Sequence, residues 1–296
     1  MSRRGMTMFA ALCVIWGIPY LLIRVAVKEL SPAFLVFSRT AIGAVLLLPL
    51  AARRGELRVL LPAWRPVLLF TVVEIGIPWL LLSRAEERLA SSLTGLLVAA
   101  VPLVAAAVTA ATGSAHRPER RSWIGLLIGI GGVAALVGLD FGRVGVVPLI
   151  EVFVVVLGYT TGPMVLSRSL SDLPSLGVIA ASLTIAALAY APFAAFEVPG
   201  HVRADVALSV VGLGVVCTAL AFLIFFALIA EVGPVRATVI TYVNPAVAAV
   251  LGVVLLGERF TVGMAIGFAL VLAGSVLATG RRRPRQAAPI VEPAPG

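Results

Sequence analysis

Three ionisable side chains lie inside long apolar stretches of this sequence. Glu74 interrupts the run "TVVEIGIPWLLL" (71–82), Arg39 lies within residues 33–50, and Glu151 lies within residues 145–166. A carboxyl group in apolar surroundings can bind a proton or a substrate group, and a guanidinium there can pair with a buried acid. What these residues do therefore depends on the elements that carry them.

The composition indicates a membrane protein. Of the 296 residues, 60% are hydrophobic and 12% are charged, and the mean hydropathy is +1.10. Soluble domains are about 45–50% apolar and about 25% charged. A soluble fold of this length has too few polar groups to cover so much apolar surface. Apolar runs of ~20 residues match helices that cross a bilayer, because barrel strands are about half as long.

We therefore expect an all-α membrane protein with ten transmembrane helices, joined by short polar connections such as "AARRGELR" and "SDLP". The segments cover about residues 6–24, 33–50, 66–83, 91–111, 123–140, 145–166, 175–195, 206–229, 237–256 and 261–279.

The two halves of the chain resemble each other at an offset of about 142–143 residues. "AAVPLVAA" (99–106) aligns with "YVNPAVAA" (242–249), which places Pro102 on Pro245. A second alignment, of residues 124–138 with 266–280, places Gly132 on Gly274. Each half then has five helices, and an odd number forces the second half to enter the membrane from the opposite side. We predict two inverted five-helix repeats, at 1–142 and 143–280, and a basic, Pro-rich, disordered tail at 281–296.

Several stretches resemble the EamA-type drug/metabolite transporter superfamily. They are the "WG" pair at Trp16 and Gly17, "SRTAIGAVLLLP" in the second segment, and "VNPAVAAVLGVVLLGERFTVGMAIGFALVLAGSVL" near the end. The likeness covers nearly all of residues 6–280, although the first half lacks the Gly-Glu pair after its fourth segment. The resemblance implies a ten-helix carrier, usually an exporter of small metabolites.

Glu74 is the strongest candidate for a substrate-binding or proton-coupling residue. It lies about eight residues from either end of its segment, and a charge at such depth costs at least ~2.5–3.5 kcal/mol on insertion scales. The alternative is a neutral carboxylic acid that hydrogen-bonds to a neighbouring helix. Pro78, one turn further on, breaks the regular hydrogen bonding of the helix and frees a backbone carbonyl on the same face.

Arg39 and Glu151 are placed nearer the outer ends of their segments. Arg39 can extend to the interface or form a salt bridge with a buried acid, and Glu151 lies at a similar depth. Whether these two residues pair cannot be decided from the sequence.

Aromatic and polar side chains at helical spacing complete the candidate site. Thr238, Thr241, Tyr242 and Pro245 share one face of the ninth segment, and Asn244 is offset from it. This polar stripe can line a cavity or make interhelical contacts. Prolines interrupt the third, fourth and ninth segments at Pro78, Pro102 and Pro245. The aromatic candidates, each of which can equally be a packing residue, are Trp16, Tyr20, Trp79 and Tyr159.

Other classes of function lack their residues in the sequence. His116 and His201 lie in connections, no Cys/His cluster has metal-ligand spacing, and no Gly-rich loop with a lysine indicates nucleotide binding. We expect no cofactor and no enzymatic activity. The arginines flank apolar segments, which fits membrane orientation better than nucleic-acid binding.

The sequence thus predicts a secondary transporter of the cell (inner) membrane that exports a small metabolite or drug by alternating access. A lipid flippase and a non-transporting scaffold or sensor are the alternatives. Proton coupling, transport direction, substrate and a homodimeric state remain open.

The distribution of basic residues predicts that both termini are cytoplasmic. With the N-terminus inside, the cytoplasmic connections and termini hold 15 Lys and Arg residues and the outer connections hold 7. A fluorescent protein fused after Gly296 is expected to fluoresce, and alkaline phosphatase fused there is expected to be inactive. An active phosphatase with a dark fluorescent fusion would reverse the orientation.

Overall fold

The structure, a computed structural model, describes residues 2–111, 120–138, 145–233 and 237–279. Within these residues the chain is helical, and ten helices or helix groups are long and apolar enough to cross a membrane, which confirms the predicted count. We number them spans 1 to 10. The predicted tail at 281–296 lies outside the described residues.

Five spans are single helices and five are built from two or more helical pieces. The elements in chain order are α1 (Arg3–Ile15) and α2 (Ile18–Ala26) in span 1; α3 (Pro32–Arg53) as span 2; η1 (Arg58–Ala63), α4 (Trp64–Phe70), η2 (Thr71–Gly76) and α5 (Ile77–Glu86) in span 3; α6 (Ser91–Val98) and α7 (Val101–Ala111) in span 4; α8 (Arg120–Val137) as span 5; α10 (Val146–Ser169) as span 6; α11 (Ser175–Phe196) as span 7; α12 (Ala204–Val211), η4 (Gly212–Leu220) and α13 (Ala221–Val232) in span 8; η5 (Thr238–Tyr242) and α15 (Asn244–Leu256) in span 9; and α16 (Val262–Thr279) as span 10.

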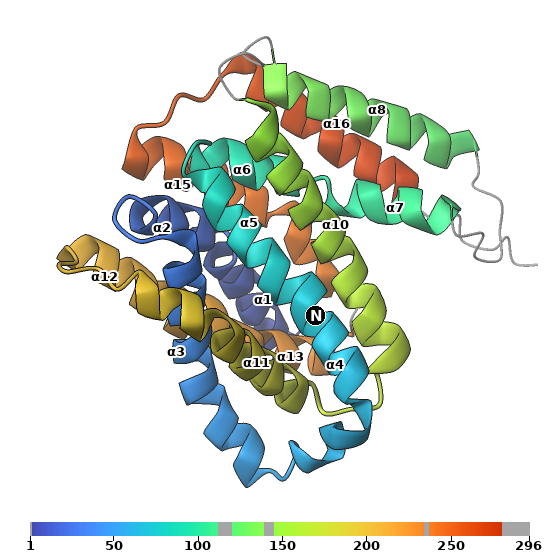
Figure 1. Cartoon of the computed structure of the whole chain (residues 1–296). Coiled ribbons are helices and arrows are strands. Elements are labelled where there is room, and N and C mark those ends of the chain that lie inside the picture. The colour runs from blue at the N-terminus through green and yellow to red at the C-terminus, as the bar shows by residue number, and fades with distance from the viewer. Residues whose placement is uncertain (1, 112–119, 139–144, 234–236, 280–296) are drawn as a thin grey trace, which may run out of the picture.

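Each span packs mainly against a span of the other half of the chain. Span 2 lies on span 7, span 4 on span 9 and span 5 on span 10, while span 3 packs on span 6 and span 1 on span 8. Figure 1 shows α8 beside α16 and α5 beside α10. Under the repeat offset, the contact between spans 3 and 6 is equivalent to the contact between spans 8 and 1. The two five-helix repeats are therefore interleaved instead of forming two separate bundles.

The contact between α8 and α16 is made through glycines. A Cβ on Gly125 would lie 2.7 Å from the carbonyl oxygen of Gly274, and a Cβ on Gly132 would lie 2.8 Å from that of Gly267. Gly125 aligns with Gly267 and Gly132 with Gly274 in the repeat, so the two contacts are equivalents of each other. Small residues let backbones approach this closely, which is how helices associate in lipid.

Carboxylates tie spans 2 and 7 together at both ends. The Glu56 side chain, just after α3, accepts a 2.8 Å hydrogen bond from the backbone N–H of Gly177 in the first turn of α11. Reciprocally, the hydroxyl of Ser31, the N-cap of α3, hydrogen-bonds to the carboxyl group of Glu197 just after α11. A carboxylate satisfies the unpaired N–H groups and the positive end of a helix N-terminus.

Glu258 caps another helix across the repeats. Its carboxylate accepts hydrogen bonds from the backbone N–H groups of Ser91, at 2.7 Å, and Ser92, at 2.8 Å, at the start of α6. Glu258 belongs to the Gly-Glu pair that follows span 9, and Gly257 adopts the positive φ of 65° that favours glycine. The pair therefore ends one helix and caps another.

Helix irregularities recur in corresponding spans of the two repeats. Spans 4 and 9 are interrupted just before Pro102 and Pro245, which lie in the first turns of α7 and α15. Spans 3 and 8 contain the π-helical segments η2 and η4, which overlap when shifted by the repeat offset. π-Helical turns are rare and are found often at functional sites.

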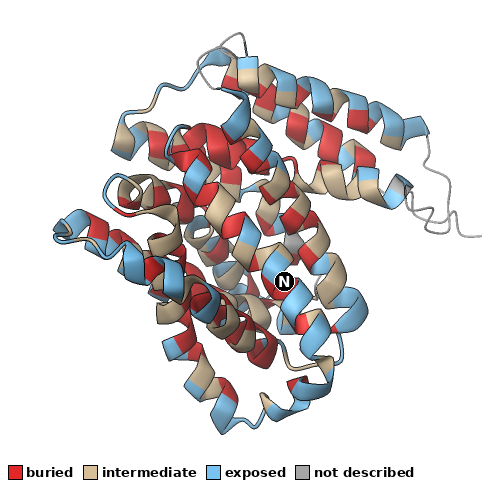
Figure 2. Ribbon diagram, viewed as in Figure 1, coloured by how far each residue is buried: buried red, intermediate tan, exposed pale blue. Residues whose placement is uncertain are grey.

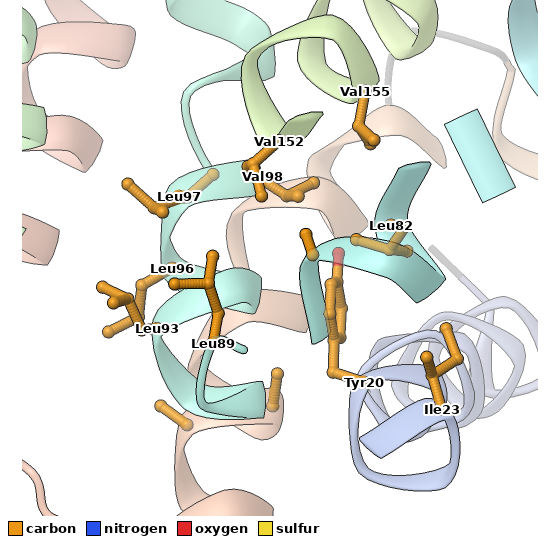
Figure 3. Packing of buried hydrophobic residues seen from close by; sticks show 14 of the residues in the cluster. Tyr20, Ile23, Leu82, Leu89, Leu93, Leu96, Leu97, Val98, Val152 and Val155 are labelled. Atoms are coloured by element: carbon orange, nitrogen blue, oxygen red, sulfur yellow. The ribbon is translucent and has the colours of Figure 1, made fainter. Parts of the chain in front are cut away.

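The largest buried cluster draws on both repeats. Figure 3 shows Tyr20 beside Leu82 and below Val98, while Val152 and Val155 of α10 approach from the second repeat. Large apolar side chains are also exposed on outward faces, for example Val45, Leu127, Leu188 and Val254. Figure 2 shows exposed residues, in pale blue, along the outer sides of the helices, where lipid would cover apolar side chains.

The glycine contact between α8 and α16 predicts that alanine substitutions at two glycines of α8 differ in their effect on stability. Gly125→Ala places its methyl group 2.5 Å from the backbone nitrogen of Ala278 and forces α8 and α16 apart. Overpacking of this kind costs about 1–3 kcal/mol. The melting temperature in detergent should fall by several degrees.

Gly131→Ala is the matched control, because a Cβ at this exposed position meets nothing within 4 Å. It should leave the melting temperature unchanged or raise it slightly, since alanine favours the helix. Equal losses from both variants would contradict the contact.

Candidate functional site

A buried group of polar and aromatic side chains lies where spans 1, 2, 3, 6 and 8 meet. Four of the predicted residues belong to it: Tyr20, Arg39, Trp79 and Tyr159. We call these four residues the Arg39 cluster. The first three come from the first repeat and Tyr159 comes from the second, so the cluster lies at the interface between the repeats.

The guanidinium of Arg39 is the centre of this cluster. Its Cζ lies 3.6 Å from the centroid of the Trp79 ring, a cation–π contact, and its Nε donates a 2.9 Å hydrogen bond to the hydroxyl of Thr218 in η4. The Arg39 side chain does not extend to the interface, because the residue is only 7% exposed. The buried position rules out snorkelling, and Arg39 forms no salt bridge with a buried acid among the described residues, so neither of the two predicted roles is found.

Two tyrosines and a thiol interact with the guanidinium. Tyr20 of α2, Tyr159 of α10 and Cys217 of η4 each interact electrostatically with Arg39. Tyr159 also interacts with Glu74 and approaches Trp79. Tyr159 therefore connects the Arg39 cluster to the carboxyl group of Glu74.

Glu74 lies in the π-helical segment η2, in a site shaped by glycines of α10. A Cβ on Gly162 would collide with the carboxyl group of Glu74, and a Cβ on Gly158 would lie 2.5 Å from both Pro78 and the carbonyl oxygen of Val73. The Oε2 atom of Glu74 is buried without a hydrogen-bond partner within the described residues. Such an oxygen can hold a proton or accept a hydrogen bond from a substrate.

The carbonyl of Gly76 in the same segment is satisfied from another span. It accepts a 3.1 Å hydrogen bond from the hydroxyl of Tyr190 in α11. This carbonyl of the irregular backbone therefore has a protein partner, which fits the rule that such backbone within a membrane must be satisfied by protein or water.

Two other candidates lie outside the cluster. Glu151 forms a salt bridge with Arg84, with Nε and Oε1 3.0 Å apart, so the Arg39–Glu151 pair considered above does not form. Trp16 packs against Phe222 and Phe225 of α13, with ring centroids 6.0 and 4.8 Å away. Its surroundings are those of a packing residue.

The candidates of span 9 lie at the break in that span, where η5 ends and α15 begins. When the amide nitrogen of Asn244 faces the neighbouring carbonyl groups, it donates hydrogen bonds to the carbonyl oxygens of Cys13, at 3.1 Å, and Ile240, at 3.0 Å. The Tyr242 hydroxyl lies 3.5 Å from that of Thr279. Thr241 lies in the 3₁₀ segment η5, where three residues per turn replace the 3.6 on which the predicted polar stripe depended.

Sequence reasoning missed two residues of this region. Thr218, whose hydroxyl accepts the hydrogen bond from Arg39, lies in η4. The sequence signal that could have identified it is the repeat offset, which aligns η4 with η2, the segment of Glu74. Glu86 at the end of α5 is fully buried, and both of its carboxyl oxygens lack partners among the described residues. Glu86 lies beyond the predicted span at 66–83, so hydropathy assigns it to the charged connection that follows.

A surface groove of about 490 Å³ runs between α3 and α11 and is lined by apolar side chains such as Phe37, Leu48 and Leu188. It has no charged lining residue and resembles a lipid-facing surface. The Arg39 cluster with Glu74 is the candidate site because it combines charge, hydrogen-bonding groups and aromatic surface at the repeat interface.

Ten spans in two interleaved inverted repeats, with an irregular polar site between them, define a multi-pass membrane transporter. The model of the EamA-like transporter family matches residues 3–138 and 148–280, and the chain belongs to this family. The two matches correspond to the two repeats.

The chain is also similar to individual proteins. The proteins named uncharacterized inner membrane transporter YedA in Escherichia coli strain K12 and in E. coli O157:H7 are each 26% identical to it, over 96% of this chain and 93% of theirs. A solved crystal structure of a protein has a TM-score of 0.66 and 23% identity, over 94% of this chain and 98% of that one. That likeness supports the fold.

The close approach of α10 to η2 predicts a coupling between Gly162 and Glu74. Gly162→Ala brings a methyl group into the Glu74 carboxyl group and to 2.9 Å from its Cβ. The variant should melt several degrees lower than the wild type.

Glu74→Ala should relieve part of this loss when combined with Gly162→Ala, because most of the colliding atoms are removed. A double-mutant cycle on melting temperatures measures the effect. Strictly additive losses would show that the two side chains do not meet.

Proposed function

We propose that this protein is a secondary carrier that exports a small metabolite by alternating access, with its substrate site at the Arg39 cluster and Glu74. The observation that supports this most directly is the position of the site, between two interleaved repeats of opposite orientation. Two similar halves that face opposite ways have two related arrangements, each open to one side of the membrane.

The burial of the cluster fits a carrier in a closed conformation. Tyr20, Arg39 and Trp79 are each less than a tenth exposed, so a substrate could reach them only after the repeats move. The contacts that join the repeats differ between the two ends of the spans. Glu56 joins α3 to α11 at one end and Glu258 joins α15 to α6 at the other. Opening one side would require breaking the contacts of that side alone.

We place the carrier in the inner membrane with both termini in the cytoplasm. The relatives named YedA carry an inner-membrane name, and the distribution of Lys and Arg favours this orientation. Export is the direction that the resemblance to the drug/metabolite superfamily implies.

Glu74 is proposed to bind the substrate or the coupled proton. Its unpartnered Oε2 lies within a polar region deep in span 3, and no basic residue among the described residues forms a salt bridge with it. Glu74→Gln keeps the shape and hydrogen-bonding capacity of the side chain but removes its ionisation. It should abolish transport or flatten its dependence on pH while leaving the melting temperature unchanged.

The measurement is uptake into proteoliposomes across a range of pH, with the compound that most stabilises the wild type in a screen of metabolites and cationic drugs. Glu87→Gln, an exposed position just beyond α5, is the matched control and should transport like the wild type. Normal transport with a normal pH profile in Glu74→Gln would show that Glu74 is not used. Failure of every compound to move across the membrane would refute the carrier itself.

A further inference from the structure

The buried guanidinium of Arg39 has no counter-ion in the part of the chain that the structure describes. The salt bridges found there involve other arginines, namely Arg54, Arg84 and Arg203. A guanidinium carries five N–H donors. The Nε–H of Arg39 bonds to Thr218, and the terminal N–H groups have no acceptor among the described residues.

The contacts that Arg39 does make do not account for burying a charge. Trp79 and the Thr218 hydroxyl are both uncharged, so the cation–π contact and the hydrogen bond hold the guanidinium in place without neutralising it. Charged groups within a membrane usually pair with an opposite charge or face a water-filled cavity.

We propose that Arg39 binds the carboxylate of the substrate, and that the substrate is a small organic monocarboxylate. This inference rests on the proposed function, because it assigns a ligand to the same site. The planar terminal N–H groups match a carboxylate in a bidentate geometry. Trp79, stacked on the guanidinium at 3.6 Å, fixes the plane in which the carboxylate is bound.

The charge of the site favours a ligand with one negative charge. With Glu74 in its neutral form, Arg39 supplies a single positive charge, whereas a phosphate ester carries about −1.5 to −2 at pH 7 and would leave a surplus in apolar surroundings. The rest of the ligand meets Tyr20, Tyr159 and the apolar side chains packed around them. An aromatic or aliphatic body fits this lining.

The assignment is tested by thermal shift on the full-length protein in detergent. Acetate, butyrate and benzoate are the carboxylate probes, while benzamide lacks the charge, benzylamine reverses it and inorganic phosphate adds to it. Benzoate and butyrate should raise the melting temperature, whereas benzamide, benzylamine and phosphate should not.

Variants of Arg39 separate binding from structure. Arg39→Gln should melt at the same temperature as the wild type or higher, because an uncompensated buried charge is removed, and it should lose the shift with benzoate. Arg39→Lys keeps the charge without the bidentate geometry and should weaken benzoate binding about tenfold or more. Arg203→Lys, whose exposed side chain pairs with Glu29 and Asp205, is the matched control and should bind like the wild type.

Three results would overturn the assignment. They are a wild-type benzoate shift in Arg39→Gln, no shift with any of the carboxylates, and a larger shift with benzylamine or phosphate than with benzoate. Transport of a neutral or cationic compound that is indifferent to Arg39 would leave the carrier intact and refute only the anion site. A protein that moves no compound would instead refute the proposed function.

Discussion

The fold depends on close contact between the two repeats. In lipid, apolar side chains gain little by moving from hydrocarbon into protein, so helices associate through tight packing and hydrogen bonds. Here spans 5 and 10 meet backbone to backbone at glycines, and spans 2 and 7 are joined at both ends by carboxylates that follow one helix and meet the start of the other. Because the main partner of each span belongs to the other repeat, the halves cannot separate as independent domains. A conformational change must therefore slide or tilt one set of spans against the other.

The candidate site follows from this interleaving. Span 2 brings Arg39 against span 8 of the other repeat, and span 6 brings Tyr159 and its glycines against the π-helical segment of span 3. π-Helical turns interrupt the regular hydrogen bonding of a helix, and membranes tolerate such backbone only where protein or water surrounds it. Their presence at corresponding places in spans 3 and 8 marks the region where the repeats meet around polar groups. The buried charge of Arg39 and the unpartnered oxygen of Glu74 lie in that region.

Hydropathy was sufficient to predict the spans, because membrane thickness sets the length of each apolar run. The repeat was indicated by the aligned prolines and glycines of the two halves. The glycine alignment also anticipated which residues of spans 5 and 10 are equivalent. Contacts between spans were beyond this reasoning: nothing in the spacing of span 2 indicates that Arg39 reaches Thr218, 179 residues away. The polar stripe of span 9 assumed one continuous α-helix, whereas the structure changes from a 3₁₀ segment to α15 at this place. Depth identified Glu74, whereas Glu86 was missed because it adjoins a charged connection.

The central claim, that the Arg39 cluster is reached in turn from the two sides of the membrane, can be tested with a native side chain. Cys217 is buried beside Arg39, and Cys13, the other cysteine, can be removed as Cys13→Ala. The rate of labelling of Cys217 by an anionic, membrane-impermeant methanethiosulfonate is measured in right-side-out and in inside-out vesicles. The account predicts that the thiol reacts from both sides. Reaction from one side only, or no reaction until the protein is denatured, would contradict it.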